Sequence, residues 1–369
     1  MALYHKGVPA DFVSRVAACP AVRAVLSPTP ASMRRLALAG VIADTVIMST
    51  GAAVRLSASG LGCPAWPQCS TADIVASKNA GQTLLNTWIE FGNRLLNFPL
   101  VILAGLIFIA VWRFRPDGQR RRDLVWLGAA QPAGVVAQAV IGGIVVLTNL
   151  NPAAVSLHFL ISASIVAGAV ALHSAVPGGR PPETPRDRGD PSPRTPLGAG
   201  KLAHPDPGVR RDLRLLSAAL VAVTGLMLAA GTVVAGTGPL AGNAAAARYK
   251  LPLEGVTQLH ADIGWLLAGL SVALLLGLRL SGAPPRAVRA GWIMLAALGS
   301  QGVIGYIQYF THLPAGLVWV HVTGSVLVWI AVLRLFFALR DRGPLMAGPP
   351  EPVAAATRRP ERQPEVLDR

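Results

Sequence analysis

QGVIGYIQYFTHLPAGLVWVH, residues 301–321, is the stretch that decides the fold, because residues 138–158, QAVIGGIVVLTNLNPAAVSLH, are a second copy of it. Both copies run from a glutamine to a histidine, and they align without a gap. Among the identical positions, Ile141, Gly142, Ile144, Thr148, Leu150 and Val155 match Ile304, Gly305, Ile307, Thr311, Leu313 and Val318. A repeat of this length in apolar sequence predicts two related halves, each presenting one imidazole at the same depth.

The chain has the composition of a membrane protein. Of its 369 residues, 52% are hydrophobic and 14% are charged, and the mean hydropathy is +0.50. The apolar residues form eight runs, each long enough to cross a lipid bilayer as a helix. The runs lie at roughly 36–54, 88–112, 124–147, 154–176, 214–235, 256–279, 290–309 and 317–340. Together with the repeat, they predict an all-α polytopic membrane protein whose eight transmembrane helices form two pseudo-symmetric four-helix bundles.

The net charge of +15 comes from arginines that cluster at alternate ends of the runs. These clusters are Arg34/Arg35, Arg113/Arg115/Arg120/Arg121/Arg122, Arg210/Arg211/Arg214, Arg286/Arg289 and Arg340/Arg342. This is the positive-inside pattern, and it predicts that both termini lie in the cytoplasm. No basic face with interleaved aromatic residues occurs, so we expect no nucleic-acid binding. The first run lacks a cleavage site, which favours an uncleaved span over a signal peptide.

The composition divides the chain into five parts. We expect an irregular cytoplasmic N-terminal tail at 1–32, an N-terminal four-helix half at 33–176, and a C-terminal four-helix half at 213–340. Residues 177–212 and 341–369 are rich in proline and charge, which predicts a disordered cytoplasmic linker and a disordered cytoplasmic tail.

The first run ends in an outer loop, VRLSASGLGCPAWPQCS, residues 54–70. A close cysteine pair on the non-cytoplasmic side favours a disulfide between Cys63 and Cys69 over a metal site, since no histidine or second cysteine pair accompanies it. Cys19, in the N-terminal tail, is interpreted as a free thiol. Arg55 begins the loop at the membrane boundary, and it could be an interfacial anchor or could bind the carboxylates of a ligand.

Ionisable residues within the apolar runs are candidate site residues, because a charge at membrane depth is costly. Asp44 lies in the first run, where it is either functional or bonded to a neighbouring helix. Glu90 and Asn93 share a helix face in the second run, and Arg94 follows them. Glu90 is either an interfacial residue or part of a site facing the bundle interior.

Three histidines lie near the outer ends of even-numbered runs: His158, His260 and His321. Several imidazoles at one depth indicate a site, and apolar surroundings suit a large flat ligand such as haem. His173 lies at the inner end of its run and His312 in an outer turn, and neither is expected to join the site.

The two halves differ in their ligands. His260 and His321 could bind one iron from both sides, giving a closed centre that transfers electrons. In the first half Asn93 stands where the partner of His158 is expected, and an amide is a poor iron ligand. We therefore expect one haem that stays and one that is worked on.

The sequence resembles the haem A synthases over all eight runs, about residues 34–340. The resemblance depends on VRLSASGLGCPAWPQC after the first run, on IEFGNR at the start of the second, and on the histidines of runs four, six and eight. It implies oxidation of the C8 methyl group of haem O to a formyl group, which gives haem A for cytochrome oxidase.

The resemblance also implies roles for single residues. His260 and His321 would hold a stable haem b, and His158 would take the substrate haem. Glu90 would be an acid/base or a polar stabiliser, and the Cys63–Cys69 disulfide would assist redox chemistry or loop structure. The chain departs from the family in having Asn93 in place of a histidine, and in lacking a second cysteine pair between residues 236 and 253.

Two alternatives remain open: a non-catalytic dihaem b electron carrier and a haem-transfer protein. The sequence also leaves open the electron acceptor, docking onto a haem O synthase or onto cytochrome oxidase assembly factors, and assembly as a homo-oligomer. The arginine-, alanine- and glycine-rich composition is typical of a GC-rich bacterial genome, so we expect a multi-pass protein of the bacterial plasma membrane.

Overall fold

The computed structural model describes residues 19–70, 75, 83–176 and 209–340, and this part of the chain is all-helical. The expected linker and C-terminal tail therefore lie almost wholly outside the described residues. The helices are α2 (Pro20–Leu26), α3 (Pro30–Leu56), α4 (Leu84–Leu95), α5 (Asn97–Arg113), α6 (Arg122–Leu147), α7 (Pro152–Ala175), α8 (Arg211–Thr237), α9 (Leu253–Leu280), α10 (Pro285–Phe310) and α11 (Ala315–Leu339). A single 3-10 turn, Pro116–Gly118, lies between α5 and α6.

Eight spans in the described residues are long and apolar enough to cross a membrane, with α4 and α5 together forming one of them. The break between these two helices falls at Leu96. Pro99 explains it, because a proline cannot donate to the carbonyl four residues earlier and its ring crowds that carbonyl. The sequence predicted one membrane span here, and the two helices together form it.

Part of the expected N-terminal tail is helical. Residues 20–26 form α2, which packs against α5 and buries Val25 in the core, so this part of the expected irregular tail is helical. Thr29 and Ser32 form a reciprocal capping box at 2.9 and 3.1 Å, and Pro30 occupies the first turn of α3. These are start signals for a helix, and they place the beginning of α3 inside the expected tail.

The turns that follow α6 and α10 have the same backbone conformation. Asn149 and Leu150 have φ angles of 53° and 60°, and their counterparts in the repeat, His312 and Leu313, have 61° and 59°. In each turn the leucine amide donates at 2.8 Å to the carbonyl five residues earlier. The predicted repeat is therefore present in the structure down to single hydrogen bonds.

The helices α3 and α8 are a second repeated pair. Shifting α3 by 180 positions aligns GAAV, residues 51–54, with GTVV, residues 231–234. In that register five buried positions coincide, pairing Met33, Ala37, Gly40, Asp44 and Met48 with Leu213, Ser217, Leu220, Thr224 and Leu228. Both halves thus direct the same face of their first helix inward.

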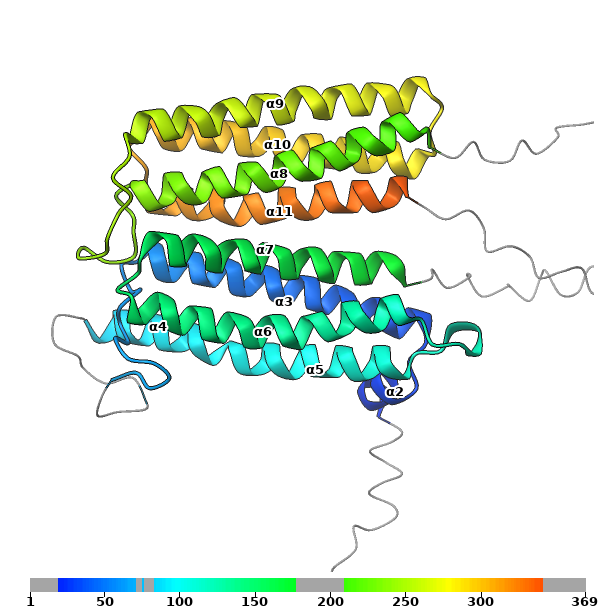
Figure 1. Ribbon diagram of the computed structural model, residues 1–369, viewed down its shortest axis with the longest axis horizontal. Coiled ribbons are helices and arrows are strands. Elements are labelled where there is room, and N and C mark those ends of the chain that lie inside the picture. The colour runs from blue at the N-terminus through cyan, green and yellow to red at the C-terminus, as the bar shows by residue number, and fades with distance from the viewer. Residues whose placement is uncertain (1–18, 71–74, 76–82, 177–208, 341–369) are drawn as a thin grey trace, which may run out of the picture.

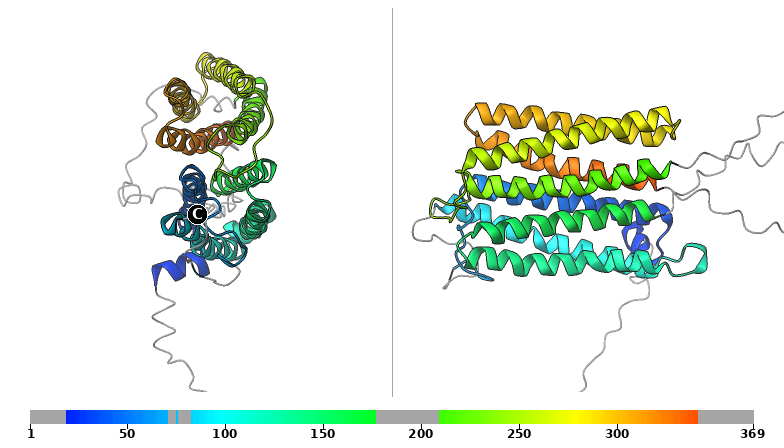
Figure 2. Two further views of the ribbon diagram at one scale, coloured as in Figure 1. Left: turned by 90° about the vertical axis from the view of Figure 1, so that its left-hand side faces the viewer. Right: turned by 45° about the horizontal axis from the view of Figure 1, so that its top comes forward.

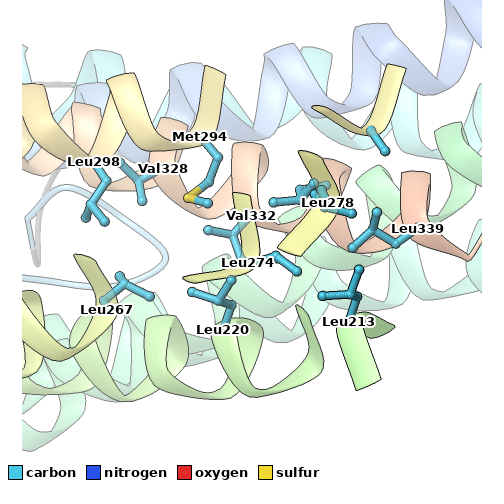
Figure 3. Packing of buried hydrophobic residues seen from close by; sticks show 12 residues of the cluster. Leu213, Leu220, Leu267, Leu274, Leu278, Met294, Leu298, Val328, Val332 and Leu339 are labelled. Atoms are coloured by element: carbon cyan, nitrogen blue, oxygen red, sulfur yellow. The ribbon is translucent and has the colours of Figure 1, made fainter. Parts of the chain in front are cut away.

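The spanning helices run side by side (Figure 1). Viewed along their axes, the blue to mid-green helices of the first half lie below the later ones (Figure 2, left). In the second half α8, α9, α10 and α11 pack in a ring around a core of leucines and Met294 (Figure 3). In the first half α3 packs on α5 and α7, and α6 joins α5 to α7. This arrangement is compatible with two four-helix bundles, and the domain boundaries stay a prediction.

The two halves meet where α3 packs on α11, α7 on α8, and α7 on α11. Two tryptophans tie this seam together: the indole of Trp329 donates to the Ala163 carbonyl, and that of Trp319 donates to the Ser49 carbonyl, both at 2.9 Å. The hydroxyls of Ser49 and Thr323 lie 2.8 Å apart. Hydrogen bonds between helices stabilise their association inside a membrane. Lipid is as apolar as the side chains, so the hydrophobic effect does not drive the helices together there.

Arginines mark one end of the helices. They lie near the starts of α3, α6, α8 and α10 and near the ends of α5 and α9: Arg34, Arg122, Arg214, Arg289, Arg113 and Arg279. The outward faces between the two ends carry large apolar side chains, such as Trp126, which is 76% exposed. The three candidate histidines lie near the opposite end.

Candidate functional site

A cavity of about 2310 Å³ opens inside the bundle and reaches residues of both halves. It is larger than the roughly 300–1,000 Å³ of a typical ligand pocket, so it has room for more than one large ligand. Its wall contains all the predicted site residues outside the disulfide: Glu90, Asn93, Arg94, Arg55, His158, His260 and His321. The structure thus brings together residues that lie far apart in the sequence.

His260 and His321 face each other across this cavity from α9 and α11. Their ring centroids are 6.4 Å apart and the ring planes are inclined at 73°. A bond from a metal to an imidazole nitrogen is about 2 Å long, so two rings on opposite sides of one metal should have centroids about 6 Å apart. The observed spacing fits one metal ion between the two rings.

Each of the three imidazoles packs against a glycine of a neighbouring helix. A Cβ atom placed on Gly142, Gly231 or Gly305 would lie 3.4, 3.1 or 3.3 Å from the Cε1 atom of His158, His260 or His321. A larger residue at these positions would displace the rings. The sequence showed that Gly142 and Gly305 are repeated positions, but it did not predict that they pack against the histidine rings.

His158 is held by the glutamine at the other end of its repeat copy. The amide of Gln138 donates to the His158 carbonyl at 2.8 Å and also to the Ser162 hydroxyl. Within the described residues, Nδ1 of His158 is buried and has no hydrogen-bond partner, and the same holds for Nδ1 of His321. Both rings line the cavity, and imidazole nitrogens are suitable axial ligands of haem iron.

The first half lacks the second imidazole and has space in its place. Gly51 aligns with Gly231, yet a Cβ atom on Gly51 would meet nothing within 4 Å, whereas one on Gly231 would meet His260. Asn93 lines this part of the cavity, and its buried Oδ1 has no hydrogen-bond partner among the described residues. The pocket around His158 is therefore more open than the pocket between His260 and His321.

Cys63 and Cys69 form the predicted disulfide. Glu90 and Arg94 hold the loop that contains it. One carboxylate oxygen of Glu90 accepts from the Cys63 amide at 2.7 Å, and the other accepts from Arg94 at 2.6 Å. Arg94 also donates to the carbonyls of Cys63, Ala65 and Gln68 at 2.7, 2.9 and 3.1 Å. Sequence reasoning placed both residues at the site but missed that they fasten this loop.

The disulfide loop covers the first-half side of the cavity. Trp66 lines the cavity and lies against Gly143 of α6, where a Cβ atom would be 2.7 Å from the indole ring. Gly143 thus makes room for the tryptophan. The loop acts as a roof, and Trp66 is a functional candidate that sequence reasoning did not single out.

Arg55 joins the two halves at the outer end. Its Nε donates to the Leu240 carbonyl at 2.9 Å and its Nη2 to the Ala235 carbonyl at 2.6 Å, at the end of α8 and in the loop that follows. The bond to Ala235 satisfies a carbonyl that the end of α8 leaves free. Binding of ligand carboxylates by Arg55 stays a prediction.

The remaining ionisable candidates lie at other levels of the helices than the three histidines. Asp44 lies deeper in the cavity wall than the histidines, His312 lies in the turn before α11 at the cavity edge, and His173 lies at the far end of α7. The described residues contain no group of three or more His, Cys, Asp or Glu side chains suited to a bare metal ion. Histidine pairs and single histidines suit an iron already held by a porphyrin.

Comparison with known proteins gives a match to the family model described as "Cytochrome oxidase assembly protein", over residues 34–333. Similar curated proteins include three named "Heme A synthase". The one from Lysinibacillus sphaericus is 30% identical over 124 residues, that from Geobacillus thermodenitrificans 27% over 112, and that from Bacillus mycoides 30% over 128.

These alignments cover 34%, 30% and 34% of this chain and 38%, 32% and 39% of the respective relatives, so the chain aligns with less than two fifths of the length of each. The family model, in contrast, spans nearly all the described helices. This multi-pass membrane protein therefore belongs to the COX15-CtaA family of cytochrome oxidase assembly proteins.

Proposed function

We propose that this protein is a haem A synthase, which oxidises the C8 methyl group of haem O to a formyl group. The observation that carries the proposal is the pair of unlike histidine sites in one cavity. The ring centroids of His260 and His321 are 6.4 Å apart, which fits one metal ion between them, whereas His158 faces a pocket with open space at Gly51. Family membership and the relatives named "Heme A synthase" support the same function.

In the second half, His260 and His321 would bind the iron of haem b from opposite sides. Gly231 and Gly305 keep the two rings in place, and the leucine core of α8–α11 keeps water away. A closed centre of this kind supplies electron transfer and has no free position for a substrate.

In the first half, His158 would hold the substrate haem from one side. Gln138 fixes the backbone of His158, and the disulfide loop with Trp66 covers the pocket. Asn93 is an amide and a poor iron ligand, so it would allow the substrate haem to exchange, and its unpartnered Oδ1 can accept a hydrogen bond from a ligand. Exclusion of bulk water protects a reactive intermediate from side reactions.

With water as the oxygen source, the conversion of a methyl to a formyl group takes up one water molecule and releases four protons and four electrons, so it requires a proton acceptor and an external electron acceptor. Glu90 is the acid/base that we propose on the protein side. It lines the cavity, and its bonds to Cys63 and Arg94 hold the carboxylate at the edge of the first-half pocket. The same bonds make Glu90 a positioning residue for the roof.

We place the protein in a bacterial plasma membrane, with both termini in the cytoplasm and the histidine pockets near the outer surface. The arginine-rich helix ends support this orientation through the positive-inside rule. The Cys63–Cys69 disulfide lies at the opposite end, and disulfides persist on the oxidising side of a membrane.

The test is to express the protein in cells that make haem O but no haem A, and to separate the extracted haems by chromatography. We expect haem A to accumulate with the wild type and not with the His158→Ala variant. Haem O alone, in the presence of folded and haem-loaded wild-type protein, would rule out the synthase.

The same experiment addresses the alternatives of a dihaem electron carrier and a haem-transfer protein, neither of which would change the extracted haem. The difference between the halves favours the enzyme. An electron carrier would be expected to have two histidine ligands for each haem iron, whereas the first half has His158 and Asn93.

A further inference from the structure

Asp44 is a buried carboxyl group that the proposed reaction does not use. It is 6% exposed and lines the cavity from α3. Its buried Oδ2 atom has no hydrogen-bond partner among the described residues. A polar group held in this way in an apolar interior is costly unless a ligand supplies the missing bond.

The position of Asp44 along α3 puts it beneath the first-half pocket. It lies twelve residues before the end of α3 at Leu56, hence about 18 Å inward, whereas His158 lies six residues from the start of α7 at Pro152, hence about 9 Å inward. It also lies seven residues, two helical turns, below Gly51 on the same face of the helix. A flat ligand held by His158 would therefore direct its inner edge toward Asp44.

Apolar side chains line the cavity at the depth of Asp44. They include Val135 of α6 and Ile165 of α7. The cavity at this level is thus suited to a hydrocarbon chain, with one carboxyl group beside it.

The second half differs at this position. Thr224 of α8 is the counterpart of Asp44 in the α3/α8 repeat, and both residues are buried. The Thr224 hydroxyl donates to the Leu220 carbonyl of its own helix at 2.7 Å. The half proposed to hold haem b thus has a bonded threonine where the half proposed to take haem O has a carboxyl group with an unpaired oxygen.

We propose that Asp44 is a specificity-determining residue, which hydrogen-bonds the hydroxyl group of the long isoprenoid substituent of haem O. This inference rests on the proposed function. Haem b carries a vinyl group where haem O carries the hydroxylated isoprenoid chain, so the two ligands differ at that position. A hydroxyl can both donate and accept, so it can pair with the carboxyl group in either protonation state, and a vinyl group can do neither.

The test compares the binding of haem O and haem B to the purified full-length protein by absorbance titration. The Asp44→Thr variant installs the residue of the second half, and Asp44→Asn keeps a hydrogen-bonding side chain of the same shape. Thr45→Val is the matched control, since Thr45 is the next residue on α3, bonds the Val41 carbonyl at 2.7 Å, and lies outside the cavity wall. His158→Ala identifies the part of the titration that belongs to the first half.

We expect the wild type to bind haem O more tightly than haem B in the first half. Asp44→Thr should weaken haem O binding about tenfold and leave haem B binding unchanged, whereas Asp44→Asn should stay within about threefold of the wild type. Thr45→Val should behave as the wild type, and the haem b spectrum of the His260/His321 site should be the same in every variant.

Retention of the full preference for haem O by Asp44→Thr would overturn the inference. So would an equal loss of affinity for both haems, or unchanged binding with turnover lost in both variants, which would indicate proton transfer. A wild type that discriminates haem O but makes no haem A would refute the synthase and leave the role of Asp44 standing.

Discussion

His260 and His321 are the two residues on which the proposed haem b site depends. Replacing either with alanine would remove one of the two proposed iron ligands, so we expect the low-spin haem b spectrum to disappear in His260→Ala and in His321→Ala. Absorption spectra of the purified variants measure this. His158→Ala is the control, since it should leave that spectrum in place. An unchanged spectrum in either of the first two variants would contradict the ligand assignment.

Glu90 combines two roles that a pair of variants can separate. Glu90→Ala removes the acceptors of the Cys63 and Arg94 bonds, each contributing about 1.5–3 kcal/mol. Glu90→Gln keeps an oxygen for Cys63 and removes the charge. We expect both variants to bind haem and to lose turnover.

The disulfide loop should open more readily in only one of these two variants. Reduction of the Cys63–Cys69 disulfide by an added thiol should be about tenfold faster in Glu90→Ala than in Glu90→Gln, because local opening exposes the bond. Equal rates in the two variants would show that Glu90 does not hold the loop. Full turnover in Glu90→Gln would remove its acid/base role.

At the scale of the helices, the contact between helix α8 and the proposed haem b site can be tested through one glycine. An added Cβ on Gly231 would lie 3.1 Å from His260, and overpacking of this kind costs about 1–3 kcal/mol. We expect Gly231→Ala to weaken haem b binding about tenfold. Gly51→Ala is the matched control on α3, because its Cβ would meet nothing within 4 Å. Haem b affinity that is equal in the two variants would contradict the packing role of Gly231.

Helix boundaries show where local sequence was enough and where it was not. The apolar runs predicted all eight spans, because length and hydropathy decide whether a helix can cross a bilayer. The signals for α2 and for the start of α3 were present in Pro20, Thr29, Pro30 and Ser32, but the expectation of an irregular tail ignored them. The break before Pro99 was equally readable, since proline removes a helix hydrogen bond.

At the scale of the whole molecule, the orientation in the membrane can be tested through one thiol. The chain has three cysteines, and with Cys63 and Cys69 paired, the exposed Cys19 is left free. A membrane-impermeant maleimide should label Cys19 in inside-out vesicles and not in right-side-out vesicles. Cys19→Ser should abolish the labelling. Labelling from the outer face would reverse the proposed orientation.

The assembled cavity was only partly predictable from sequence. The repeat and the shared depth of the histidines indicated that the imidazoles would lie close together. In the structure the ring centroids of His260 and His321 are 6.4 Å apart. The bonds of Arg55 to Ala235 and Leu240 join residues about 180 positions apart, and no local pattern marks them. The contrast between Asp44 and Thr224 could be recognised only after α3 had been aligned with α8. That alignment follows from the buried residues of the two helices, which the structure provides.

The contacts between the two halves bear on how the protein evolved. Exchanging the halves turns the α3–α11 contact into the α8–α7 contact and returns the α7–α11 contact to itself, which is the pattern of an isologous interface about a twofold axis. Such a pattern implies that an ancestral four-helix protein paired with itself before its gene was duplicated and fused. Fusion then allowed the two former subunits to diverge, so that Asp44 now stands in one half where Thr224 stands in the other.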